Sequence, residues 1–112
     1  MNIETLLGKT LTSVVNEDDE RIVFTTNTGQ RFALFHEQDC CESVRVEEII
    51  GDLSDLVGSP ITEAAEETSA VETDDGTWTF YKIGTRKGSV TLRWLGESNG
   101  FYSESVNFGA VK

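Results

Sequence analysis

The chain has 112 residues, of which 38% are hydrophobic and ten are aromatic, so it suits a single folded domain over residues 1–112 with little room for a second module. Twenty acidic residues against nine basic ones give a formal net charge of −11, and a field of this sign excludes direct binding of DNA or RNA. No signal-peptide pattern opens the chain, and no stretch reaches the roughly 20 apolar residues that a membrane span needs. We therefore expect a cytoplasmic protein without a membrane partner.

The first part of the chain predicts an antiparallel meander. Residues 9–16 and 20–27 are rich in Val, Ile and Thr, which favours two strands. A turn signal at residues 27–30 leads into a third strand at 31–35. This third strand delivers His36 at its end.

The middle of the chain predicts a strand, a short helical turn and an acidic segment. Residues 44–50 favour a strand, and residues 52–57 favour one helical turn, with Asp52 as its cap and Gly58 after its end. Residues 61–71 alternate poorly and are acidic, so they fit either an edge strand or a helical turn.

The last third predicts three strands, at residues 77–84, 89–95 and 101–108. The apolar side chains expected on their inward face are Trp78, Phe80, Val90, Leu92, Trp94, Val106 and Phe108. The fold class is therefore mainly β, a β-rich α+β domain built as an antiparallel meander sheet or a small barrel, with one short helical turn near residues 52–57.

Residues 36–42 hold the only histidine and both cysteines of the chain, with three carboxylates among them. Imidazole nitrogen and thiolate sulfur are ligands that Zn²⁺ prefers, and a carboxylate can complete a tetrahedral site. The expected ligands of a structural zinc ion are His36, Asp39, Cys40 and Cys41. Alternatives for the fourth position are Glu37, Glu42 and Glu97. The chain has no second ligand pair of the kind that zinc sites commonly use.

Adjacent cysteines allow other roles as well. A reducing cytosol disfavours disulfides, and neighbouring cysteines pair only through a strained eight-membered ring, so we expect no disulfide between Cys40 and Cys41. Buried structural thiols and a redox or nucleophilic cysteine are the remaining alternatives. Neighbours in an extended strand point to opposite faces, so joint metal binding predicts a turn of the backbone at residues 40–41.

The negative charge is concentrated in one region of the sequence. Residues 37–75 carry thirteen carboxylates and one arginine, a formal charge of −12, and the rest of the chain sums to +1. Such a region attracts basic grooves, and carboxylates at phosphate-like density can occupy a channel that normally binds nucleic acid. The alternative is a solvated acidic face that only keeps the protein soluble. The carboxylates expected to bind a partner are Glu47, Glu48, Asp52, Asp55, Glu63, Glu66 and Glu67.

Four segments of the chain have distinctive sequence motifs, including HEQDCCE and GESNGFYSESV. These segments are 36–44, 51–61, 78–82 and 93–106. In these segments the chain resembles a small domain family of unknown function that is common in phages and prophages of Gram-positive bacteria. It is also similar to the anti-CRISPR proteins with which phages inhibit the RNA-guided nuclease of type II CRISPR systems. The second resemblance implies a zinc-binding inhibitor in the cytoplasm of the infected host bacterium.

The expected function is therefore binding without turnover. The acidic surface would enter the positively charged channel of the type II nuclease and block DNA loading or cleavage, and the zinc ion would hold that surface in shape. An alternative is a phage structural or host-modulating protein with another partner. A further alternative is a small metal-dependent hydrolase with Glu42 or Glu97 as general base.

Overall fold

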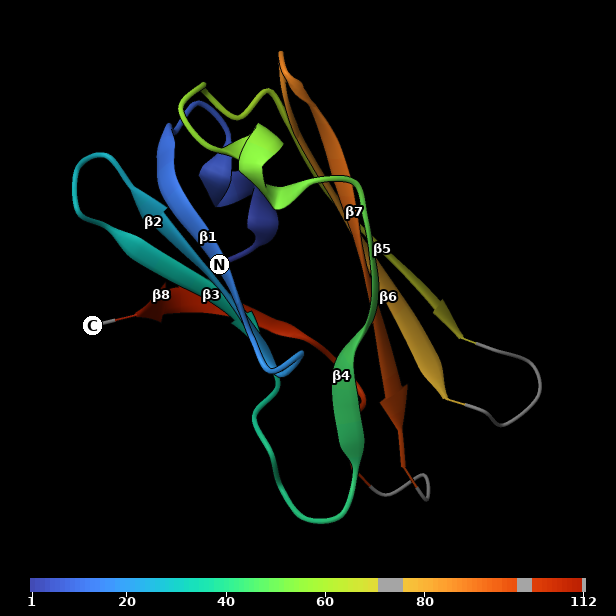
Figure 1. The fold of residues 1–112 in the computed structure, drawn as a ribbon. Helices are drawn as coiled ribbons and strands as arrows, with labels where there is room; N and C mark the ends of the chain where they lie inside the picture. The colour runs from blue at the N-terminus through green and yellow to red at the C-terminus, as the bar shows by residue number, and fades with distance from the viewer. Residues whose placement is uncertain (71–75, 99–101, 112) are drawn as a thin grey trace.

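The computed structural model, which describes residues 1–70, 76–98 and 102–111, contains two four-stranded antiparallel sheets (Figure 1). The first sheet has the strand order β1-β2-β3-β8 and the second has the order β4-β7-β6-β5. The strands are β1 (Leu11–Glu17), β2 (Arg21–Thr26), β3 (Arg31–Phe35), β4 (Ser43–Ile50), β5 (Glu63–Ala70), β6 (Thr77–Thr85), β7 (Gly88–Glu97) and β8 (Asn107–Val111). The predicted β class and the meander of the first three strands are confirmed. The barrel alternative is wrong, because the described strands form two separate open sheets.

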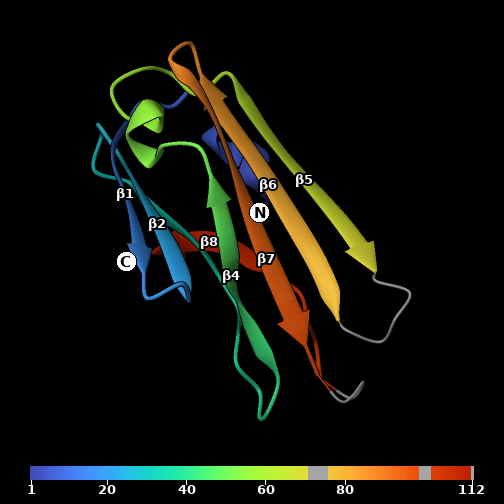
Figure 2. The same ribbon diagram turned by 45° about the vertical axis from the view of Figure 1, so that its right-hand side comes forward.

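The two sheets share one hydrophobic core, which lies between their facing surfaces (Figure 2). Phe24 and Leu34 enter it from the first sheet, and Tyr81, Leu92 and Trp94 enter it from the second. In β7 the buried side chains alternate with more exposed ones, as the period of two in a β-strand requires, whereas β2 and β3 each bury three consecutive residues. Burial of these large apolar groups is the main force that holds the sheets together.

Two 3-10 turns, η1 (Ile3–Leu6) and η2 (Leu53–Leu56), lie at one end of the pair of sheets (Figure 1). The side chain of Asp52 accepts a hydrogen bond from the Ser54 backbone N–H at 2.9 Å, which satisfies an amide that the short turn leaves without a partner. The predicted helical turn with its Asp52 cap is therefore confirmed. The described residues contain no α-helix.

The predicted inward face of β6 is wrong. Thr79, Tyr81 and Ile83 are buried on the inner face, so Trp78 and Phe80 lie on the outer face and are only partly buried. Their rings stack with centroids 6.1 Å apart, and the Arg93 guanidinium lies 4.8 Å from the Trp78 centroid. Mutual stacking thus covers part of the apolar surface that the core does not bury.

The last predicted strand is shifted along the chain. Strand β8 begins at Asn107, and residues 102–106 run in an irregular segment before it, while residue 101 lies outside the described part. The inward positions of Val106 and Phe108 are confirmed, since both are partly buried against the core. Within the segment 102–106, Glu104 and Ser105 contact residues of the site described below.

Candidate functional site

The loop of residues 36–42 connects the two sheets at the end opposite to η1 and η2 (Figure 1). It begins where β3 leaves the first sheet and ends where β4 enters the second. The segment 102–106 runs beside it before entering β8, which pairs with β3. Residues that are far apart in the sequence therefore meet here.

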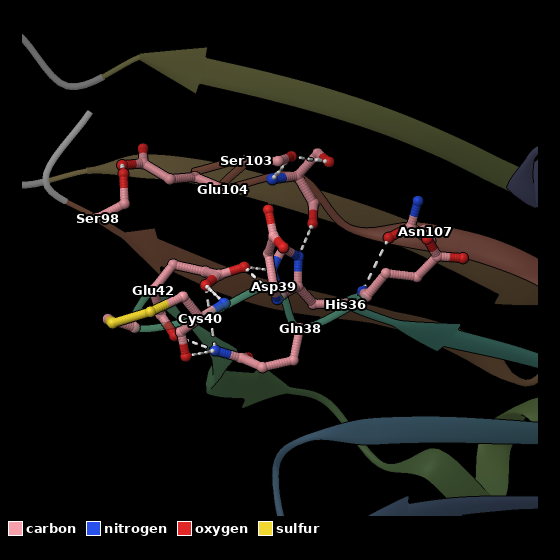
Figure 3. Close-up of polar contacts among 12 residues, drawn as sticks. His36, Gln38, Asp39, Cys40, Glu42, Ser98, Ser103, Glu104 and Asn107 are labelled. Carbon is pink, nitrogen blue, oxygen red and sulfur yellow. Dashed lines mark hydrogen bonds and ion pairs between the residues drawn. A yellow bond between two sulfur atoms is a disulfide. The ribbon is translucent and has the colours of Figure 1, made fainter. Parts of the chain in front are cut away.

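His36 and Glu42 form a buried ion pair within this loop (Figure 3). Their side chains are 4% and 0% exposed, and His36 Nε2 lies 2.8 Å from Glu42 Oε2. The other ring nitrogen, Nδ1, lies 2.7 Å from the backbone carbonyl oxygen of Ser105. A carbonyl and an ionised carboxylate only accept hydrogen bonds, so hydrogens on both ring nitrogens satisfy this arrangement. Both ring nitrogens of His36 therefore face acceptor oxygen atoms.

The Glu42 carboxylate organises the rest of the loop. It accepts hydrogen bonds from the backbone N–H groups of Asp39 at 2.9 Å and Cys40 at 2.8 Å, and from the Gln38 amide at 3.2 Å. The hydrogen bond from His36 is the main reason that the pKa of Glu42 is lowered to about 2, and the backbone donors act in the same direction against the effect of burial. Glu42 is therefore an ionised anchor around which the backbone turns.

We expect this pairing to make the unfolding free energy depend on pH in acid. The folded-state pKa of Glu42, about 2, lies below its ordinary value of 4.5, so the stabilisation is present above the ordinary value and is lost as the pH falls towards the folded value. Glu42→Gln lacks this titration. The difference in urea unfolding free energy between the two proteins should therefore shrink over that pH range. A constant difference would show that the carboxylate charge does not stabilise the fold.

The expectation that Cys40 and Cys41 stay unpaired is wrong, because a disulfide joins them. The backbone bends at residues 40–41, which confirms the predicted turn. The N–H groups of Asp39 and Cys40 both point to Glu42, and this curvature brings neighbouring side chains together. Both cysteines are exposed, so the alternative of buried structural thiols is also wrong.

The predicted zinc ligands do not form a ligand set in this arrangement. Both nitrogens of His36 face protein oxygen atoms, and both sulfur atoms are bonded to each other. Within residues 1–70, 76–98 and 102–111, no group of three or more His, Cys, Asp or Glu side chains is placed to hold a metal ion. Zinc binding therefore stays a prediction, and it requires the disulfide to open and His36 to change partner.

The carboxylates predicted to bind a partner do not share one surface. Glu47 and Glu48 lie on edge strand β4, where Glu47 pairs with Arg45 at 3.2 Å and Glu48 pairs with Arg93. Asp52 and Asp55 belong to η2 and its cap. The third group is on β5, at the opposite edge of the same sheet, and consists of Glu63, Glu66 and Glu67. Within the described part of the chain, these three take part in no ion pair.

One group of residues at this end was not predicted from the sequence. The Glu104 carboxylate accepts hydrogen bonds from the hydroxyls of Ser98 at 2.5 Å and Thr77 at 2.7 Å, and these bonds lower the pKa of Glu104. Two consecutive residues of the 102–106 segment thus make contacts here, because Glu104 binds Ser98 and Thr77 and the Ser105 carbonyl oxygen lies against His36. Ser98 and Glu104 both lie within the distinctive segment 93–106, and this was the only feature of the sequence that marked them as candidate site residues.

The amino-acid sequence matches a family model described as a domain of unknown function, DUF7448, over residues 4–108. The chain belongs to this family. No curated protein and no solved structure matches the chain. No helix in the described ranges is long and apolar enough to cross a membrane. In this DUF7448 domain, the distinctive segments 36–44 and 93–106 meet at the contact between His36 and Ser105.

Proposed function

We propose that the protein acts by binding, and that the β5 edge enters a basic groove of the RNA-guided type II CRISPR nuclease and blocks DNA loading or cleavage. The observation that carries this proposal is the state of Glu63, Glu66 and Glu67. All three are exposed on an edge strand, and none forms an ion pair within the described residues. Their charge is therefore available to a partner.

The carboxylates of β5 resemble the phosphates of a nucleic-acid strand, at a lower density of charge. A β-strand rises about 3.3 Å per residue, so the three side chains span about 13 Å along the edge. One DNA strand carries a phosphate about every 3.4 Å, so three carboxylates over about 13 Å have about half the charge density of a single strand. Glu66 lies opposite Tyr81 and Glu67 lies opposite Phe80, so these two carboxylates belong to different faces of the sheet. Glu47 and Glu48 contribute less, because arginine side chains already neutralise them.

Charge reversal tests the proposal. We expect Glu63→Lys with Glu66→Lys and Glu67→Lys to abolish nuclease binding and inhibition, because like charges then face the basic groove. A matched control with the same net charge is Glu4→Lys with Glu20→Lys and Glu37→Lys, at three exposed positions outside β5. Pull-down of guide-loaded nuclease and a DNA-cleavage assay on the same samples measure both effects.

The control should bind and inhibit as the unmodified protein does. Equal inhibition by both variants would place the interface elsewhere. If the unmodified protein neither binds nor inhibits the nuclease, the alternative of a phage structural or host-modulating protein with another partner takes its place.

The contacts of the predicted general bases favour binding over hydrolysis. Glu42 is fully buried and is held by His36, Gln38 and two backbone N–H groups. Glu97 forms an ion pair with Arg45 at 3.1 Å. A general base must reach the proton that it removes, and the enclosed Glu42 carboxylate is not placed to do so in this arrangement.

Zinc binding is a separate proposal that concerns the reduced chain. Reduction of the disulfide would free two thiolates next to Asp39 in the sequence, and His36 would leave Glu42 to join them. We expect metal analysis of the reduced protein to find one zinc ion per chain, and Cys40→Ser with Cys41→Ser to remove it and lower the thermal midpoint. A reduced protein that takes up no zinc contradicts this proposal.

A further inference from the structure

A polar pocket of about 400 Å³ lies beside the 102–106 segment, next to β5 and β6. Two carboxylates line it, Glu66 from β5 and Glu104 from the segment, together with hydroxyl groups such as those of Thr77 and Thr79. None of the described lining residues is Lys, Arg or His. The pocket falls in the size range of small-ligand sites, about 300–1,000 Å³, and carries negative charge without a counter-charge.

The hydrogen bonds between residues that line the pocket use up their donor hydrogens, so mainly hydrogen-bond acceptors remain for a ligand. The Thr77 hydroxyl donates its hydrogen to Glu104 at 2.7 Å, so only its oxygen lone pairs are left for a ligand. The Glu104 carboxylate, whose pKa is lowered by its hydroxyl donors, is an acceptor as well. Glu66 adds a second carboxylate from the β5 side. Such a pocket is complementary to a cation that has several N–H donors.

Thr79 provides an independent observation. Its side chain lines the pocket, yet the residue is only 3% exposed. Within the described part of the chain its hydroxyl makes no hydrogen bond. The hydroxyl oxygen is not among the buried polar atoms that lack a partner, so it opens onto the pocket, where it can meet a ligand. The Thr79 hydroxyl is therefore a recognition group that a ligand in the pocket would satisfy.

We infer that this pocket binds a guanidinium group, as in an arginine side chain or a small alkylguanidine. A guanidinium is planar and always charged, and its five N–H donors point in several directions, which matches carboxylates and hydroxyls on different walls. Tyr102 also lines the pocket and can offer a ring face to the cation. A calcium ion would need six to eight oxygen ligands, and the described residues offer no group of three carboxylates.

Isothermal titration of the whole chain, in the absence of nuclease, tests the inference. One arm uses agmatine, and the other uses a blocked pentapeptide of four glycines around a central arginine. We expect saturable binding. Glu66→Gln should weaken it about tenfold by removing a negative charge that faces the guanidinium, and Thr79→Val should weaken it about tenfold by removing a hydrogen bond to that charged group. The matched controls Glu20→Gln and Thr25→Val lie outside the pocket and should change nothing.

The two arms distinguish the sources of the group. Binding of agmatine at least as tight as that of the peptide indicates a free alkylguanidine, and binding of the peptide alone indicates an arginine side chain of a partner. No saturable binding to the folded protein, or binding that the two pocket variants leave unchanged, overturns the inference. Both proposals use Glu66, but the titration contains no nuclease, so its failure would leave the function proposed for the β5 edge untouched.

Discussion

Replacing Trp94 with alanine is expected to lower the unfolding free energy by about 3–5 kcal/mol, the usual loss for a large aromatic side chain in a core. Trp94 is fully buried on the inner face of β7. Trp78→Ala should cost only about 1–2 kcal/mol, since its outer-face ring is partly exposed and gains mainly from Phe80 and Arg93. Urea unfolding followed by far-ultraviolet circular dichroism measures both.

Both variants replace tryptophan with alanine, so a difference between their unfolding free energies reflects the position of the side chain and not the type of residue. A larger loss for Trp78→Ala than for Trp94→Ala would contradict the register in which Trp78 lies opposite Leu95 and Thr79 lies opposite Trp94. A shift of β6 by one residue would exchange its two faces completely.

Gly96→Ala is expected to lower the unfolding free energy by about 1–3 kcal/mol, the usual range for added volume in a packed site. A Cβ at this position would lie 2.5 Å from the Glu104 carbonyl oxygen and 2.7 Å from the Glu104 Cβ. The 102–106 segment would have to move, which would weaken the hydrogen bonds of Glu104 and the contact between Ser105 and His36. Urea unfolding measures the loss.

Gly109→Ala provides the control for this prediction. Its added Cβ would meet only Phe35 Cε1 at 3.9 Å, which is ordinary contact, so we expect a change within about 0.5 kcal/mol. Equal effects at both glycines would show that the close approach of β7 to the segment does not stabilise the fold.

Local signals in the sequence predicted the elements well. Val, Ile and Thr enrichment marked β1 and β2, and Asp52 with Gly58 marked the turn η2. The bend at residues 40–41 was predicted because two adjacent cysteines can bind one metal ion only where the backbone turns. Each of these features depends on residues within one short stretch, so composition and spacing suffice to find it.

Features that depend on the pairing of distant segments could not be predicted in this way. Alternate residues of β6 are large on both faces, Trp78 and Phe80 on one and Tyr81 and Ile83 on the other, so the pattern alone does not choose the inner face. Glu42 could be assigned to His36 only once the loop was folded. The continuous acidic region of the sequence is likewise divided by the sheet order between the opposite edges β4 and β5.

The placement of β8 next to β3 has a consequence for the folding rate. Hairpins β1-β2 and β2-β3 can form early from neighbouring residues, but the free side of β3 is covered only when a strand made of residues 107–111 arrives. His36 and Ser105, which hold the same junction, are 69 positions apart. Closing such a long loop is entropically unfavourable, and proteins dominated by distant pairings fold in milliseconds to seconds. During that interval the exposed edge of β3 is the site at which two nascent chains would aggregate.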